Sequence, residues 1–135
     1  MKRKGTRAER ELFHMLWNSK FPVVRSAGSG STPLPNPDLI ASNGKRTLAI
    51  ECKAIKNKSK HFNKIEIDQL IVFSKQFGAE PWLAIKFDNN GWHFIQPKKL
   101  KKIKSGNYSI NLELAKKSGI KFEELIGLYK QVRLK

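Results

Sequence analysis

Three side chains between positions 38 and 53 could do chemistry together: Asp38, Glu51 and Lys53. Two carboxylates held close together are unfavourable unless a cation neutralises them, and hard oxygen ligands of this kind suit Mg²⁺, with Mn²⁺ as a substitute. A lysine two residues after the second carboxylate could orient an attacking water. This set therefore indicates metal-dependent hydrolysis. The alternative is a charged solvent face on an edge hairpin.

The element that must position these residues is a hairpin around Asn43-Gly44. Asn-Gly between two strand-forming runs is a strong hairpin signal. With these two as the loop residues, Ser42 pairs with Lys45 and Asp38 lies opposite Ala49. Because side chains alternate along a strand, one face then carries positions 38, 49, 51 and 53, and the other carries 39, 48, 50 and 52.

Composition points to a polyanionic partner. The 135 residues include 27 Lys and Arg against 11 Asp and Glu, a net charge of +16, and nucleic acid is the polyanion that fits best. No long apolar segment or basic amphipathic terminal helix favours a membrane, and the N-terminus lacks the apolar core of a secretory signal. We expect one domain, residues 1–135, in the cytoplasm, where a lone cysteine stays reduced.

A helix is predicted from about residue 6 to 19, with an inward stripe of apolar residues: Ala8, Leu12, Met15 and Leu16. Thr6 to Glu9 has the spacing of a capping box, in which the Glu9 carboxylate reaches back to the Thr6 amide. The functional alternative turns Glu9 toward Asp38 as a further acidic group at a metal site.

Several cations could contact phosphates, and for each the alternative is an ordinary surface residue. Arg25 ends a predicted strand over 21–26. Ser29 and Ser31 are further candidate phosphate contacts in a Gly, Ser and Pro loop over 27–37. A basic N-terminal arm over residues 1–5 and a basic segment over 54–64 add these cations: Lys2, Arg3, Lys4, Lys56, Lys58 and Lys60.

The rest of the chain predicts a helix, a hairpin and a basic C-terminal part. The helix spans 66–77, ends at Gly78, and turns Ile67, Leu70, Ile71 and Ser74 inward, with Phe73 and Phe77 on a neighbouring face. Strands over 82–87 and 92–95 follow, with His93 pointing outward. Residues 97–104 are either a DNA-facing flank or a solubilising face. An extended piece over 108–110 and a helix over about 122–129 complete the chain.

In this order the elements resemble the archaeal-type Holliday junction resolvases of the PD-(D/E)xK nuclease superfamily, over roughly residues 3 to 95. The resemblance is carried by Lys4-Gly5-Thr6-Arg7-Ala8-Glu9-Arg10-Glu11, Val24-Arg25-Ser26-Ala27-Gly28-Ser29-Gly30, Pro37-Asp38-Leu39-Ile40-Ala41, Leu48-Ala49-Ile50-Glu51-Cys52-Lys53 and Phe73-Ser74-Lys75-Gln76-Phe77-Gly78. It implies an α/β fold with a central mixed sheet flanked by helices, a restriction-endonuclease-like core. It also implies a metal-dependent homodimer that nicks opposed strands of a four-way DNA junction.

The resemblance assigns roles residue by residue. It implies that Glu9, Asp38 and Glu51 form the acidic, metal-binding set, and that Lys53 is the catalytic lysine. It further implies roles for a loop serine, two substrate-contacting cations and two interface aromatics: Ser29, Arg10, Arg25, Phe73 and Phe77. Residues beyond about 97 match poorly and receive no role. Two rival functions stay open, a related restriction or repair endonuclease and a basic protein that binds DNA without cutting it.

Overall fold

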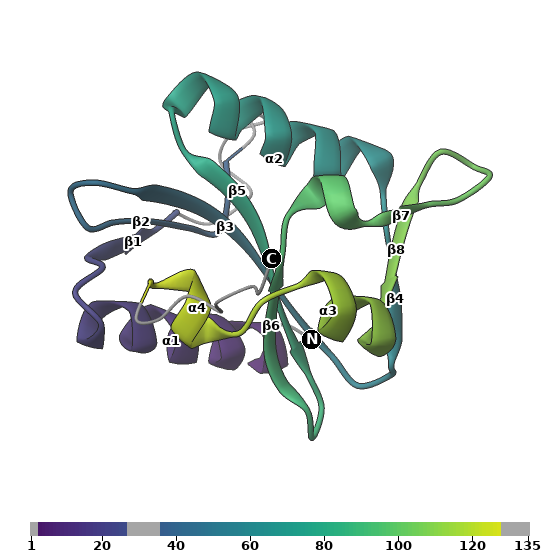
Figure 1. Cartoon of the computed structure of the whole chain (residues 1–135), viewed down its shortest axis with the longest axis horizontal. Coiled ribbons are helices and arrows are strands. Elements are labelled where there is room, and N and C mark those ends of the chain that lie inside the picture. Colours follow the sequence, from purple (N-terminus) through teal and green to yellow (C-terminus); the bar gives the residue numbers. More distant parts are fainter. Residues whose placement is uncertain (1–2, 27–35, 128–135) are drawn as a thin grey trace, which may run out of the picture.

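A five-stranded mixed sheet forms the centre of the molecule (Figure 1). The computed structural model describes residues 3–26 and 36–127, with the side chains of residues 3–6 left aside. The strand order is β1-β2-β3-β5-β6, and only β3 and β5 run parallel. The strands are β1 (Val23–Arg25), β2 (Leu39–Ser42), β3 (Thr47–Ile55), β5 (Glu80–Phe87) and β6 (Gly91–Ile95). The predicted mixed α/β sheet is confirmed.

Two long helices cover opposite faces of this sheet because each carries one apolar stripe. Helix α1 (Arg3–Asn18) packs Ala8, Leu12 and Leu16 on the face that includes Leu39, Leu48 and Ile50. Helix α2 (Lys64–Phe77) packs on the face that includes Ala49, Leu83 and Ile85. The segment between β3 and β5 is thus a crossover connection, as a parallel pair requires.

The predicted capping box is wrong because α1 begins at Arg3, three residues before Thr6. Thr6 therefore lies inside the helix, where it cannot act as the N-cap. Glu9 is instead paired with Arg25, whose Nε lies 2.9 Å from Glu9 Oε2. Met15 is only partly buried, while the other three residues of the predicted stripe are buried.

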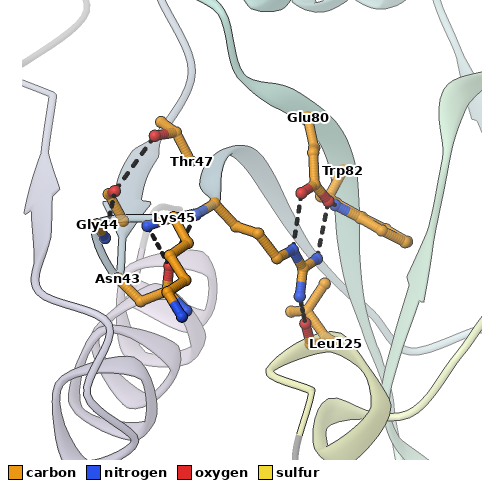
Figure 2. Close-up of polar contacts among 9 residues, drawn as sticks. Asn43, Gly44, Lys45, Thr47, Glu80, Trp82 and Leu125 are labelled. Atoms are coloured by element: carbon orange, nitrogen blue, oxygen red, sulfur yellow. Dashed lines mark hydrogen bonds and ion pairs between the residues drawn. The ribbon is translucent and has the colours of Figure 1, made fainter. Parts of the chain in front are cut away.

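The hairpin between β2 and β3 has a longer loop than predicted. Ser42 pairs with Thr47 rather than with Lys45, so the loop spans residues 43–46. The side-chain oxygen of Asn43 explains the difference, since it accepts hydrogen bonds from the amides of Lys45 and Arg46 (Figure 2). Because the register moves by two residues, every side chain keeps its predicted face.

Arg46 joins this loop to two distant elements. Its guanidinium donates to both carboxylate oxygens of Glu80 at 2.8 Å, at the start of β5. A further nitrogen donates to the carbonyl oxygen of Leu125 at 2.6 Å, in the short helix α4 (Phe122–Leu125). Figure 2 shows Glu80, beside Trp82, and Leu125 at these two contacts. The bidentate pair lowers the pKa of Glu80 through its hydrogen bond to Arg46.

Helix α2 begins and ends at specific capping residues. Asn63 accepts a hydrogen bond from the Ile65 amide, and Gly78 ends the helix as predicted, in the left-handed conformation with φ of 83°. The prediction was wrong for Ile71, which is 39% exposed, whereas Ile67, Leu70 and Ser74 are buried. An apolar strip therefore remains on the outer side of α2.

A second, smaller sheet extends the fold beyond the central one. Its order is β4-β8-β7, with β4 (Ser59–Phe62), β8 (Tyr108–Asn111) and β7 (Lys101–Lys102). The basic segment over 54–64 contains the end of β3 and all of β4. A 3₁₀ turn η1 (Pro97–Lys99) precedes β7, and helix α3 (Leu112–Ser118), absent from the sequence prediction, follows β8. The predicted last helix is α4, which ends at Leu125, so its expected continuation over 126–127 is wrong, and residues 128–129 lie outside the described residues.

His93 is 1% exposed, so its predicted outward orientation is wrong. Strand alternation placed it on one face of the second hairpin, but residues 115–121 cover that face. Its ring packs edge-on against Phe87. Within the part of the chain that the structure describes, no helix has the length and apolar character needed to cross a membrane.

Candidate functional site

The acidic pair lies where the hairpin of β2 and β3 meets the centre of the sheet. Leu39 pairs with Ile50, so the preceding residue, Asp38, is level with Glu51. Asp38 Oδ2 accepts a hydrogen bond from the backbone amide of Cys52 at 2.9 Å. The predicted juxtaposition of the two carboxylates is therefore present, with Asp38 level with Glu51 rather than diagonal to it.

The two carboxylates strongly disfavour each other's charge. Burial raises the pKa of Glu51, and the negative charge of Asp38 raises it further, to about 8. Burial also raises the pKa of Asp38, opposed by the hydrogen bond from Cys52 and reinforced by Glu9. At neutral pH the pair therefore carries less than its full charge unless a cation enters. Burial in this negative surrounding raises the pKa of the Cys52 thiol as well, which makes it a poor nucleophile.

Lys53 lies beside this pair and is held by Glu66, a residue that the sequence prediction missed. Lys53 Nζ lies 2.6 Å from Glu66 Oε2. Burial opposes the charge on Lys53, but the hydrogen bond and charge of Glu66, with the charges of Glu51 and Asp38, raise its pKa overall. Lys53 is therefore a cation at neutral pH. Glu66 lies in the first turn of α2, and only the packing of this helix over β3 brings its carboxylate to Lys53.

Glu9 comes from α1, on the other side of the acidic pair. Its negative charge contributes to the raised pKa values of Asp38 and Cys52. Its carboxylate is held by Arg25 at the end of β1, with 17% of the Glu9 side chain exposed. The structure thus brings Glu9 and Arg25 together. Arg25 is engaged with this carboxylate as well as being a predicted DNA contact.

The remaining predicted contacts lie outside this centre or outside the described residues. The side chains of Arg10, Lys56, Lys58 and Lys60 are exposed. Lys2 and Ser29 fall outside the described residues, and for Arg3 and Lys4 the structure describes only the helical backbone. The DNA-binding roles of all these residues stay predictions.

The donor set fits a hard divalent cation. Among the described side chains, no three His, Cys, Asp or Glu groups are already close enough together to hold a metal ion. Asp38 and Glu51 nevertheless offer the oxygen donors of two partly buried carboxylates, whose mutual repulsion a cation would relieve. A cavity of about 60 Å³ borders Glu51 and Glu66.

The outer side of α2 presents an apolar strip. Phe77 is 55% exposed and its ring stacks on that of Phe73, with centroids 5.1 Å apart. Phe73 is partly buried against the core, so the two predicted interface aromatics differ in environment. Three further apolar residues of the helix are also exposed: Ile65, Ile71 and Val72.

Comparisons with known proteins cover nearly the whole chain. A family model described as archaeal Holliday junction resolvase (Hjc) matches residues 1–134. The crossover junction endodeoxyribonuclease Hjc of Archaeoglobus fulgidus is 40% identical over 133 residues, which are 94% of this chain and 98% of that protein. The enzyme of the same name from Methanocaldococcus jannaschii is 42% identical over 132 residues, or 98% of this chain and 93% of that protein.

A solved structure of Archaeoglobus fulgidus Hjc, described as a Holliday junction resolvase, has a similar fold. It superposes with a TM-score of 0.84 at 36% identity, covering 91% of this chain and all of that chain. The family match over residues 1–134 extends well past the limit near residue 97 expected from the sequence motifs.

Proposed function

Because the chain belongs to the archaeal Holliday junction resolvase family, we propose that it is an endodeoxyribonuclease that resolves four-way DNA junctions by nicking opposed strands. The observation that carries this proposal is the partly buried pair of Asp38 and Glu51 with Lys53 beside it. The net charge of +16 supports a polyanionic substrate. We expect the protein to act in the cytoplasm, where its DNA substrate would be.

Asp38 and Glu51 would hold Mg²⁺, with Mn²⁺ as a substitute, and Glu9 would complete the site directly or through water. When bound, the cation activates water and stabilises charge on the phosphate oxygens. Glu51 would have to be deprotonated to serve as a ligand, because a carboxylate binds a metal ion in its charged form. The Cys52 amide donates a hydrogen bond to Asp38 and so holds this second carboxylate in place to bind the cation.

Lys53 would act on the phosphate and the attacking water. Its raised pKa keeps the ammonium charged at neutral pH, so it stabilises the negative charge that develops on the phosphate in the transition state. Glu66 restricts the lysine to one orientation. Glu66 is a positioning residue in this mechanism, since it contacts Lys53 rather than the reacting atoms.

We also propose a symmetric homodimer that uses the apolar strip of α2. Two nicks in opposed strands require two acidic sites, and one chain supplies one. An isologous dimer meets this need because a four-way junction has approximate two-fold symmetry. The exposed Phe77, stacked on Phe73, is an aromatic group of the kind that a dimer interface buries, and Val72 and Ile71 are further exposed apolar residues of the same helix.

A cleavage assay tests the proposed function. The protein is incubated with a labelled four-way junction, with a linear duplex of the same sequence, and with a supercoiled plasmid, each with and without Mg²⁺. We expect paired nicks in the junction only with the cation, and little cleavage of the duplex. Equal cleavage of duplex and junction would indicate a restriction or repair nuclease instead. Tight binding without any nick would indicate a non-catalytic DNA-binding protein.

A further inference from the structure

Lysines from three elements surround a hollow whose lining residues come much later in the sequence than the acidic pair. The hollow has a volume of about 740 Å³, with Ser109 and Asn111 of β8 among its lining residues. Lys99 in η1, Lys101 in β7, and Lys116 and Lys117 in α3 lie around it, and all four are exposed. Among the described residues, none of these four lysines forms an ion pair with a carboxylate.

One carboxylate, Glu113, also borders this hollow without neutralising it. It precedes Lys116 and Lys117 by three and four residues in α3, the spacing at which helical ion pairs form. No such pair is present among the described side chains. The lysines thus keep their charge directed to solvent, ready for an external anion.

A second hollow, of about 360 Å³, lies on the other side of α3 and shares Lys116 and Lys117 with the first. It adds Lys121, whose Nζ lies 3.2 Å from Nε2 of the buried His93. An ammonium can only donate, so Nε2 is the acceptor and the imidazole is neutral. Burial and the charges of Lys121 and Lys116 lower the pKa of His93, in agreement with this assignment. Glu124 also borders this hollow.

We propose that this α3 basic surface, made of Lys99, Lys101, Lys116, Lys117 and Lys121, binds the sugar-phosphate backbone of one DNA arm. A solubilising face would place its lysines singly on convex surface or beside carboxylates. Here five cations border two adjoining hollows that meet at α3. A backbone carries one phosphate charge per 3.4 Å of each strand, so it can engage several of them at once.

The surface is near enough to the acidic pair for one duplex to reach both. Lys53 pairs with Ile85, and Ile85 pairs with His93, so Lys53 and His93 project from the same side of the sheet. Their strands are separated by β5 alone, or about 10 Å at the usual strand spacing. The inference rests on the proposed function, because the arm in question belongs to the junction that is cleaved.

The test compares two variants with the same change in charge. The surface variant is Lys101→Gln, Lys116→Gln and Lys117→Gln. The control is Lys20→Gln, Lys45→Gln and Lys75→Gln, three exposed lysines outside the surface. Binding to a labelled junction is measured from 50 to 200 mM salt, with arms of about 25 and about 8 base pairs. Circular dichroism checks that both variants are folded.

We expect the surface variant to bind the long-armed junction at least about tenfold more weakly than the control does, with a salt slope reduced by about 2 to 3. The difference should shrink on short arms, and nicking of the short-armed junction at saturating protein should match that of the control. Equal affinities of the two variants on long arms would overturn the inference. If the surface variant lost binding to polyglutamate but kept its binding to the junction, the surface would instead fit an acidic protein, and the inference would be overturned. If the proposed cleavage is absent from the unmodified protein, the binding comparison still decides this inference.

Discussion

Asp38 is tied to the strand that carries its acidic partner, because its carboxylate accepts a hydrogen bond from the Cys52 amide, the next amide after Glu51. This bond restricts how far the two carboxylates can separate, although both are partly buried and the negative charge of Asp38 raises the pKa of Glu51. Repulsion is thus maintained by the fold, as expected where a cation is to bind between oxygen donors.

Asp38→Asn and Glu51→Gln should each abolish cleavage while the junction is still bound. Both remove a charge that would hold the metal, and an Asn oxygen can still accept from Cys52. We expect cleavage to fall at least about 100-fold, roughly 2.7 kcal/mol in the activation barrier. Single-turnover nicking and gel-shift binding measure the two effects. The control is Glu123→Gln, an exposed carboxylate of α4. Near-normal cleavage by both variants would contradict the proposed site.

The free energy of unfolding should decrease as the pH rises, and Mg²⁺ should offset this decrease. The pKa of Glu51 is about 8 in the fold against an ordinary 4.5. The folded state therefore binds this proton more tightly, and the resulting stabilisation is complete below pH 4.5 and is lost as the pH rises through 8. Thermal unfolding with EDTA should show this loss, and Mg²⁺ should raise Tm more at pH 8.5 than at pH 5.5. Glu51→Gln should flatten both trends. A Mg²⁺ effect that is equal at the two pH values would count against the assignment.

Glu66→Gln should slow cleavage by about 10- to 100-fold without weakening junction binding, because Lys53 loses the partner that orients it. Above neutral pH, the cleavage rate should fall as Lys53 loses its proton. Because Glu66 contributes to the raised pKa of Lys53, this fall should begin at a lower pH in the variant than in the unmodified protein. Asp68→Asn is the matched control, as Asp68 lies on the same helix in an exposed pair with Lys64. Equal rates for the two variants would remove Glu66 from the mechanism.

Phe77→Ala should convert the dimer into a folded monomer. Phe77 is exposed in the single chain, so its truncation should cost the fold of that chain little stability. Truncation of an aromatic interface anchor costs about 2 kcal/mol or more in association. Sedimentation should show the monomer, and paired nicking should decline before DNA affinity does. Adding Phe73→Ala tests the same interface but also removes a ring that packs on the core. Val24→Ala, an exposed apolar residue of β1, is the control. A folded Phe77→Ala variant that stays dimeric would reject this interface.

The faces of the hairpin were predictable, whereas its register was not. Strand alternation has a period of two, so an error of two residues at Asn43 left Glu51 and Lys53 on the correct face. Other features depended on tertiary packing. His93 reads as an outward residue until α3 covers it, and α3 itself is a short, charged helix with a weak periodic signal. Glu66 was missed because only the packing of α2 over β3 brings it to Lys53.

Arg46, in the loop between β2 and β3, contacts two elements that come much later in the chain. It follows Asp38 and precedes Glu51 in sequence, yet its partners are 34 and 79 residues away, in β5 and α4. Contacts of such high sequence separation form late, because a long loop must close first. During synthesis, the acidic residues Glu9, Asp38 and Glu51 would be made well before β5 and α4, the two elements that Arg46 contacts. The contacts of Arg46 can therefore form only after β5 and α4 have been synthesised, so the loop between β2 and β3 gains its long-range partners after the acidic residues are already present.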